Sequence, residues 1–182
     1  MCGIVGIWNR HSQRIDQSVL DRFTDSLSHR GPDGRGTILH EEANLGLGHR
    51  RLAIIDLTDS GHQPMPYGNN RYWIVFNGEI YNFLELRAEL EGLGHQFHTD
   101  SDTEVVLASY VQWGQDCQLK FNGMWAFAIW DNSDHTLFLS RDRFGVKPLY
   151  FLNERGWFLF ASELKAFMSL PLSIRPQFDD QM

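Results

Sequence analysis

The segment that most constrains the fold is residues 124–131, MWAFAIWD. It has the aromatic and aliphatic composition of a β-strand but lacks the alternation of a strand with one face in water. A strand of this kind needs apolar cover on both faces. Two antiparallel sheets packed together, each with helices on its outer side, would supply that cover. The sequence therefore predicts an α+β fold, arranged as a four-layer α/β/β/α sandwich.

The other strands of the two sheets are expected in short apolar segments bounded by Gly, Pro, Asn or Ser. These segments are residues 3–8, 45–47, 52–57, 71–77, 136–142, 148–152 and 157–162. Residues 29–36 and 58–70 are rich in Gly and Pro, which break both helical and strand periodicity, so we expect loops there.

Three helices are expected on the outer faces. The first carries Val19, Phe23 and Leu27 at four-residue spacing, which gives it one apolar side. The other two follow segments with the spacing of a capping box, NFLE from Asn82 and SDTE from Ser101. Each of these helices should end at a following glycine.

The length of 182 residues suits one folded domain, which we assign to residues 1–169. Residues 170–182 contain two prolines and show no hydrophobic periodicity. We expect them to form a linker toward a further domain that this chain does not include.

The charge and cysteine content excludes several classes of protein. There are 16 Lys and Arg against 23 Asp and Glu, a net charge of −7, so no nucleic-acid partner is expected. No apolar run is long enough for a membrane span, and the N-terminus lacks a secretory pattern, so we expect a cytoplasmic protein. Two cysteines and scattered histidines predict neither a disulfide framework nor a metal site.

Cys2 is the strongest candidate for chemistry. Removal of Met1, which commonly precedes a small second residue, would place a thiol and an α-amine on one residue. A free α-amine titrates near ~8, so it can accept the proton of the thiol at neutral pH. The alternative is a small buried side chain without a role. The strand expected from residue 3 onward favours the nucleophile, because it anchors the terminus.

Three further positions have both a functional and a structural interpretation. Asn77 and Gly78 end a strand and could form an oxyanion hole, or an ordinary turn. Arg50 or Arg51 could bind a carboxylate through two parallel hydrogen bonds, or could be a solvated charge. Asp102 could bind a substrate ammonium, and also interacts favourably with the dipole of the helix that it begins.

The order of eight motifs resembles the glutaminase domain of the asparagine-synthetase family, a class II glutamine amidotransferase and N-terminal-nucleophile hydrolase. The motifs run over about the whole chain, and each is weak alone, but their shared order is specific. They are MCGIVGI, HRGPDGRG, GHRRLAIIDL, FNGEIYN, SDTEVV, FNGMWAFAIWD, RDRFGVKPLY and FASELKAF.

The resemblance implies a role for each matching position. Cys2 matches the nucleophile, and Asn77 and Gly78 match the oxyanion hole. Arg51 matches the residue that binds the α-carboxylate of glutamine, with Arg50 as its rival. Positions expected to contact the rest of the substrate are Glu79 and Asp102 near its amine, and the backbone of Leu52, Ala53, Ile54 and Ile55 along the pocket.

The implied activity is hydrolysis of L-glutamine to glutamate and ammonia through a thioester on Cys2. The ammonia would pass to a covalently linked, ATP-dependent synthetase domain, so ATP and magnesium are expected there and no cofactor here. A homodimer is a further possible assembly. One alternative is an acceptor other than aspartate, and another is a non-catalytic docking domain, whose signature would be loss of the cysteine. A further alternative is the glutaminase domain of glucosamine-phosphate synthase or of amidophosphoribosyltransferase. The motifs GHRRLAIIDL and FNGEIYN fit those two families poorly.

Overall fold

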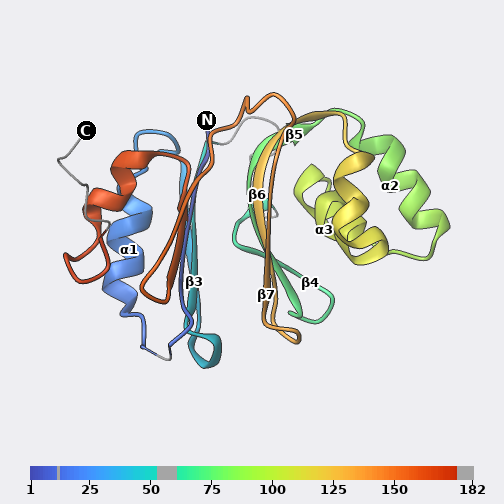
Figure 1. Cartoon of the computed structure of the whole chain (residues 1–182). Coiled ribbons are helices and arrows are strands. Elements are labelled where there is room, and N and C mark those ends of the chain that lie inside the picture. Colours follow the sequence, from blue (N-terminus) through green and yellow to red (C-terminus); the bar gives the residue numbers. More distant parts are fainter. Residues whose placement is uncertain (12, 53–60, 176–182) are drawn as a thin grey trace.

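Two antiparallel β-sheets lie face to face in the computed structural model, which describes residues 1–11, 13–52 and 61–175 (Figure 1). The first sheet has the order β2-β3-β1-β9-β8 and the second the order β4-β5-β6-β7. The first contains β1 (Gly3–Asn9), β2 (Gly34–His40), β3 (Leu45–Arg51), β8 (Tyr150–Glu154) and β9 (Trp157–Ala161). The second contains β4 (Met65–Tyr67), β5 (Tyr72–Ile80), β6 (Gly123–Asp131) and β7 (Thr136–Arg141).

Helices cover the outer face of each sheet (Figure 1). The first sheet is covered by α1 (Gln17–Asp25) and a 3-10 helix, Leu164–Ser169, and the second by α2 (Phe83–Gly92) and α3 (Asp102–Trp113). Short 3-10 helices also occur at Glu41–Ala43 and Gly114–Leu119. The predicted α/β/β/α sandwich is therefore confirmed.

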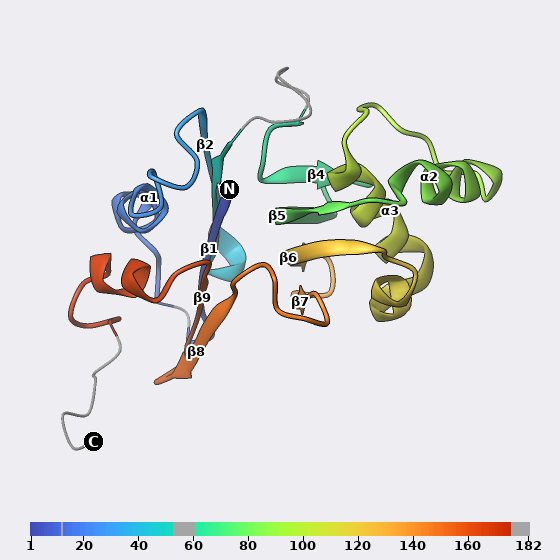
Figure 2. The same ribbon diagram turned by 90° about the horizontal axis from the view of Figure 1, so that it is seen from above.

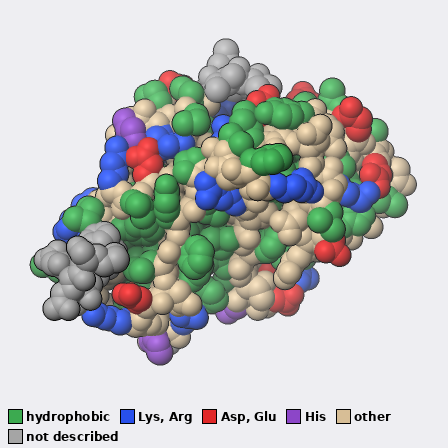
Figure 3. All heavy atoms as spheres, turned by 45° about the horizontal axis from the view of Figure 1, so that its top comes forward, with side chains coloured by type: hydrophobic (Ala, Val, Ile, Leu, Met, Phe, Trp, Pro, Cys, Tyr) green, Lys and Arg blue, Asp and Glu red, His purple; other side chains and the backbone are tan. Residues whose placement is uncertain are grey.

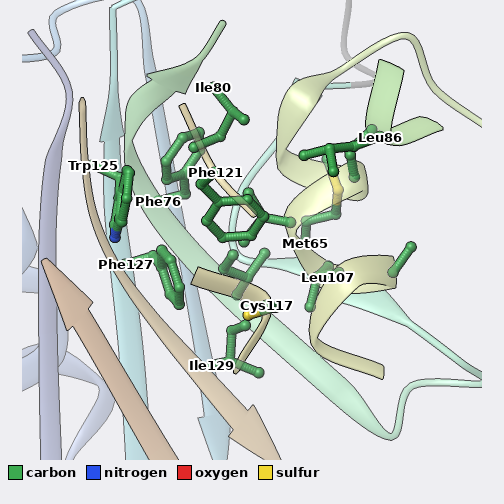
Figure 4. Packing of buried hydrophobic residues seen from close by; sticks show 14 of the residues in the cluster. Met65, Phe76, Ile80, Leu86, Leu107, Cys117, Phe121, Trp125, Phe127 and Ile129 are labelled. Atoms are coloured by element: carbon green, nitrogen blue, oxygen red, sulfur yellow. The ribbon is translucent and has the colours of Figure 1, made fainter. Parts of the chain in front are cut away.

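The β6 strand is covered on both faces, as its composition predicts. Ala126, Ala128 and Trp130 belong to the cluster between the two sheets, together with Ile4 and Val75. The alternate side chains Trp125, Phe127 and Ile129 pack toward α2 and α3 (Figure 4). A third cluster fills the space between α1 and the first sheet.

Several boundaries differ from the expected ones. The segment 45–51 is one continuous strand, and the expected strand 52–57 lies largely outside the described residues. Two strands, β2 and β4, occupy parts of segments expected to be loops. The glycines of β2 suggest a loop, but Gly36 is needed for a close approach of two chain segments. A Cβ there would lie 2.0 Å from the carbonyl oxygen of Gln63.

The two predicted capping boxes have different outcomes. The Asn82 side chain makes no capping bond and instead joins α2 to the segment before β6, donating to the Lys120 carbonyl and accepting from the Asn122 N–H. Ser101 does cap α3, accepting from the Thr103 N–H. Glu104 turns away from Ser101 and accepts hydrogen bonds from the N–H groups of the loop before it, at His98 and Thr99.

Among the described residues, no helix is both long and apolar enough to cross a membrane. In the segment expected to be a linker, Leu170 belongs to the cluster between α1 and the first sheet, and Ile174 packs against that cluster.

Candidate active site

A cavity of about 320 Å³ opens at one end of the sandwich, where the N-terminus lies beside the ends of β3 and β5. Figure 2 shows the N-terminus beside β1 and β2 of the first sheet, on the side toward the second sheet, and Figure 3 views the same end, where hydrophobic side chains are exposed beside Lys and Arg. The cavity is lined by every described residue to which the sequence assigns a part in the site. These residues are Cys2, Arg51, Leu52, Asn77, Gly78, Glu79 and Asp102.

The register of the first sheet brings Cys2 to this cavity. Antiparallel pairing of β1 with β3 sets Gly3 opposite Arg50, so the chain before β1 continues along the residues that follow β3. The Cys2 Sγ lies 3.4 Å from the Leu52 N–H nitrogen and 3.7 Å from the Leu52 carbonyl oxygen. The thiol is therefore held at the cavity wall by backbone groups, and the buried strand behind it cannot slip without moving its whole apolar face.

The backbone of Cys2 is held from the opposite side by Arg30. Its Nε donates to the Cys2 carbonyl at 2.9 Å, and its Nη1 pairs with Glu163 at 2.9 Å. Burial opposes ionisation of Glu163, but hydrogen bonds from Arg30, His29 and Lys165 outweigh it and lower its pKa to about 2. The pair therefore stays charged over the physiological range and keeps the carbonyl of Cys2 in place.

Asn77 presents an unused hydrogen-bond donor. The residue is 1% exposed, and its Nδ2 makes no hydrogen bond within the described part of the chain. An unpaired buried amide costs roughly 1–3 kcal/mol, so an oxygen arriving from a ligand would relieve that cost. Gly78 follows, and a Cβ there would lie 2.4 Å from the Met124 carbonyl oxygen, which explains the glycine.

The two adjacent arginines point in different directions. Arg51 lines the cavity. Arg50 lies on the other face of β3, where its Nε donates to the Gly31 carbonyl and its Nη1 pairs with Asp25 on α1. Of the two rivals for the carboxylate, the geometry brings only Arg51 to the cavity.

Acidic groups lie at the α3 side of the cavity. Asp102 accepts a hydrogen bond from the Ile80 N–H at 3.0 Å, which ties the start of α3 to the end of β5. Burial, with a smaller contribution from the negative charge of nearby Glu79, raises the pKa of Asp102 to about 6. The charged lining of the cavity thus includes a cationic group from β3 and carboxyl groups from β5 and α3, and Lys147 and Asp100 line it as well.

His49 and Gln63 are among the lining residues that have no part in the interpretation of the sequence alone. His49 lies two residues before Arg51 on the same face of β3, and burial lowers the pKa of its imidazole to about 3, so it is neutral. The period-two alternation counted back from Arg51 would have found it. Gln63 comes from the segment before β4, and no local pattern marks it.

Ala53, Ile54 and Ile55 lie outside the described residues. In the ranges that are described, no group of three or more His, Cys, Asp or Glu side chains could hold a metal ion.

The whole chain, residues 1–182, matches the family model of the glutamine amidotransferase domain. The chain belongs to this family. It is 48% identical over 171 residues to asparagine synthetase [glutamine-hydrolyzing] 1 of Bacillus subtilis, covering 92% of this chain and 27% of that protein. It is 45% identical to asparagine synthetase [glutamine-hydrolyzing] 3 of the same organism, covering 94% of this chain and 28% of that protein. The chain therefore spans about a quarter of the length of these relatives.

The fold has a solved counterpart in glutamine phosphoribosylpyrophosphate amidotransferase from B. subtilis. The TM-score is 0.75 at 24% sequence identity, covering 92% of this chain and 43% of that one. At this identity the likeness concerns the fold alone.

Proposed function

We propose that this chain is the glutaminase part of an asparagine-synthetase-like enzyme, with Cys2 as its nucleophile. The observation that carries the proposal is that one cavity brings together a thiol, an unpaired buried amide, an arginine and the carboxyl groups of Glu79 and Asp102 among its lining residues. An α-amino acid with a side-chain amide has a complementary set of groups. The donors of Asn77 suit the amide oxygen, Arg51 suits the α-carboxylate, and Asp102 with Glu79 suits the α-ammonium.

The reaction follows from these positions. The α-amine of Cys2 accepts the thiol proton, and the thiolate attacks the side-chain carbon of glutamine. Asn77 and the Gly78 N–H hold the oxyanion while the ammonium form of that amine protonates the leaving nitrogen, which departs as ammonia. Water then attacks the thioester with help from the free amine, releasing glutamate and restoring the thiol. The net reaction consumes one glutamine and one water.

Removal of Met1 is a condition for this mechanism. While Met1 is attached, the nitrogen of Cys2 belongs to a peptide bond and cannot accept a proton. Met1 itself lines the cavity, and its amine donates to the Arg30 carbonyl at 3.2 Å. Loss of Met1 would both free the base and enlarge the space for substrate.

The fate of the ammonia belongs to the longer protein. The relatives are named asparagine synthetases, so aspartate is the acceptor we propose, in a covalently linked synthetase domain that uses ATP and magnesium. The glutaminase domain itself is proposed to need no cofactor. An acceptor other than aspartate is the alternative. A cytoplasmic location and a homodimer are further expectations for the full-length protein.

A glutamine-analogue electrophile, such as a diazoketone, tests the nucleophile. The chain contains its own control, because Cys117 is fully buried and burial raises its pKa to about 12. Intact mass of processed protein should increase by one adduct, which peptide mapping places on Cys2. Cys2→Ser should abolish labelling and glutamine hydrolysis, whereas Cys117→Ala should retain both. An adduct on Cys117, or none, would favour the non-catalytic docking domain.

A further inference from the structure

Gln63 lies between β5 and α3, and the proposed mechanism gives it no role. Its side chain is buried, and its Oε1 accepts a hydrogen bond from the Phe76 N–H of β5 at 2.6 Å. Its Nε2 donates to the Thr103 hydroxyl of α3 at 3.3 Å. All three residues line the cavity. One amide therefore links the strand that carries Asn77 to the helix that begins with Asp102.

The position of Gln63 explains why a side chain makes this link. β4 pairs with β5 with Met65 opposite Ile74, and the same register two residues further would set Gln63 opposite Phe76. The β4 strand begins only at Met65, so the Phe76 N–H has no strand carbonyl there. The amide oxygen of Gln63 takes the place of that carbonyl and satisfies a buried donor.

A second bond ties the same two elements together. The Ile80 N–H donates to the Asp102 carboxylate, four residues along β5 from Phe76. Phe76, Gly78 and Ile80 are alternate residues of one strand, so their N–H groups point to the same edge. The stretch Asn77–Gly78–Glu79 pairs with β6 along one edge. Its other edge, to which the Gly78 N–H points, lies between the two hydrogen-bonded connections from β5 to α3, one through Gln63 and one direct.

The main chain of Gln63 also contacts the other sheet. A Cβ on Gly36 of β2 would lie 2.0 Å from the Gln63 carbonyl oxygen, which means that the segment rests directly on the first sheet. Gln63 consequently contacts three parts of the fold: the first sheet, next to which Cys2 lies, the strand that carries Asn77 and the helix that carries Asp102.

We propose that Gln63 is a positioning residue, which sets the distance between the oxyanion donors at Asn77 and Gly78 and the ammonium-binding carboxyl group of Asp102. This role rests on the proposed glutaminase activity. A substrate fixed at its α-amino end by Asp102 can place its amide oxygen against Asn77 only when that distance is correct. An error of about 1 Å in such a placement costs on the order of 10²-fold in rate.

Gln63→Met tests the role, because methionine has a similar length and makes neither hydrogen bond. We expect kcat per Cys2 site, titrated with the diazoketone, to fall about 10- to 100-fold. KM should change little, because the lost geometry matters most in the transition state. Amide exchange of the Phe76 N–H, followed by NMR, should become faster. Thr103→Val removes only one of the two bonds and should give a smaller fall in kcat.

The matched control is Asn9→Leu at the opposite end of β1. It also removes two hydrogen bonds made by a buried amide side chain, those from the N–H groups of His11 and Gln13. Its kcat per site should stay within about twofold of the wild type. An equal loss in Asn9→Leu would overturn the positioning role, since general destabilisation would then explain both variants.

The two proposals fail in different ways. A processed wild-type chain that does not hydrolyse glutamine would overturn the proposed function. An active wild type whose Gln63→Met variant keeps its kcat per titrated site would overturn only the role of Gln63. If Gln63→Met does not fold, unchanged kcat in a folded Thr103→Val variant would overturn the role.

Discussion

At the scale of single residues, the site consists of buried polar groups whose burial costs free energy unless a ligand pairs with them. The unpaired Nδ2 of Asn77 and the carboxyl group of Asp102 are both expensive to bury, and both line the cavity that contains the Cys2 thiol. Groups that destabilise the fold in isolation are typical of sites that bind a complementary ligand.

Asn77→Ala should separate binding from catalysis. The side-chain amide is expected to bind the oxyanion more strongly than the ground-state amide oxygen, so its loss should lower kcat by about 10²–10³. Binding of glutamine to a Cys2→Ala background, measured by calorimetry, should remain nearly unchanged. Turnover within about tenfold of the wild type would rule out this role for Asn77.

Glutamine binding should weaken as the pH falls through about 6. The raised pKa of Asp102 means that its carboxyl group is ionised above that pH and neutral below it. Only the ionised form attracts a substrate ammonium, so the dissociation constant of glutamine in Cys2→Ala protein should increase below pH 6. In Asp102→Asn this dependence should disappear, with weak binding at all pH values from 5 to 8. A dissociation constant that does not change with pH in the Cys2→Ala protein that retains Asp102 would contradict the role of Asp102 in binding the ammonium.

The same carboxyl group should lower the stability of the fold at neutral pH. Its pKa is raised from 3.8 to about 6, so the folded state binds the proton more tightly and ionisation favours unfolding. The penalty is absent below the unfolded pKa and is complete above the folded pKa, where it amounts to about 3 kcal/mol. Asp102→Asn should therefore raise the free energy of unfolding in urea at pH 7.5 but not at pH 3.5. Equal effects at both pH values would show that ionisation is not the cause.

At the scale of secondary structure, composition predicts where the strands lie better than it predicts why a glycine occurs at a given position. The apolar run of β6 correctly indicates a strand with two covered faces, and Ser101 correctly marks the start of α3. The glycine-rich composition around Gly34 and Gly36 predicts a loop, although both residues lie in β2. The sequence cannot distinguish a glycine that turns the chain from one that lets a neighbouring chain approach, because the neighbour comes from a distant segment.

Gly36→Ala and Gly92→Ala should have opposite effects on stability. A Cβ at Gly36 would overlap the Gln63 carbonyl, and backbone must shift, so we expect a loss of about 1–3 kcal/mol. A Cβ at Gly92, at the end of α2, meets nothing within 4 Å. There the alanine should stabilise the helix by about 0.5–1 kcal/mol. Urea unfolding of the two variants checks both signs, and a neutral Gly36→Ala would mean that the contact with Gln63 is not tight.

At the scale of the whole molecule, the sandwich brings together two groups of site residues, or half-sites, one from each side of the cavity, that are far apart in sequence. One sheet supplies Cys2 and Arg51, and the other supplies Asn77, while Asp102 comes from a helix outside it. Motif order predicts these residues, and strand alternation could have added His49. Gln63 could not be predicted, because its bonds to Phe76 and Thr103 exist only after the second sheet and α3 have packed together. The two proposed anchors of glutamine are thus brought together by tertiary packing alone.

Because both half-sites lie within this chain, glutamine hydrolysis should not depend on any further domain. The chain spans about a quarter of its asparagine synthetase relatives, yet it contains a cavity lined by all the described groups that the proposed mechanism uses. Processed chain should form glutamate at the same rate with or without ATP, magnesium and aspartate, and release one ammonia per glutamate into solution. Coupled assays for glutamate and ammonia, with chromatography for asparagine, measure this directly. Formation of asparagine, or a rate that requires ATP, would contradict an independent glutaminase unit, and Cys2→Ser protein provides the background rate.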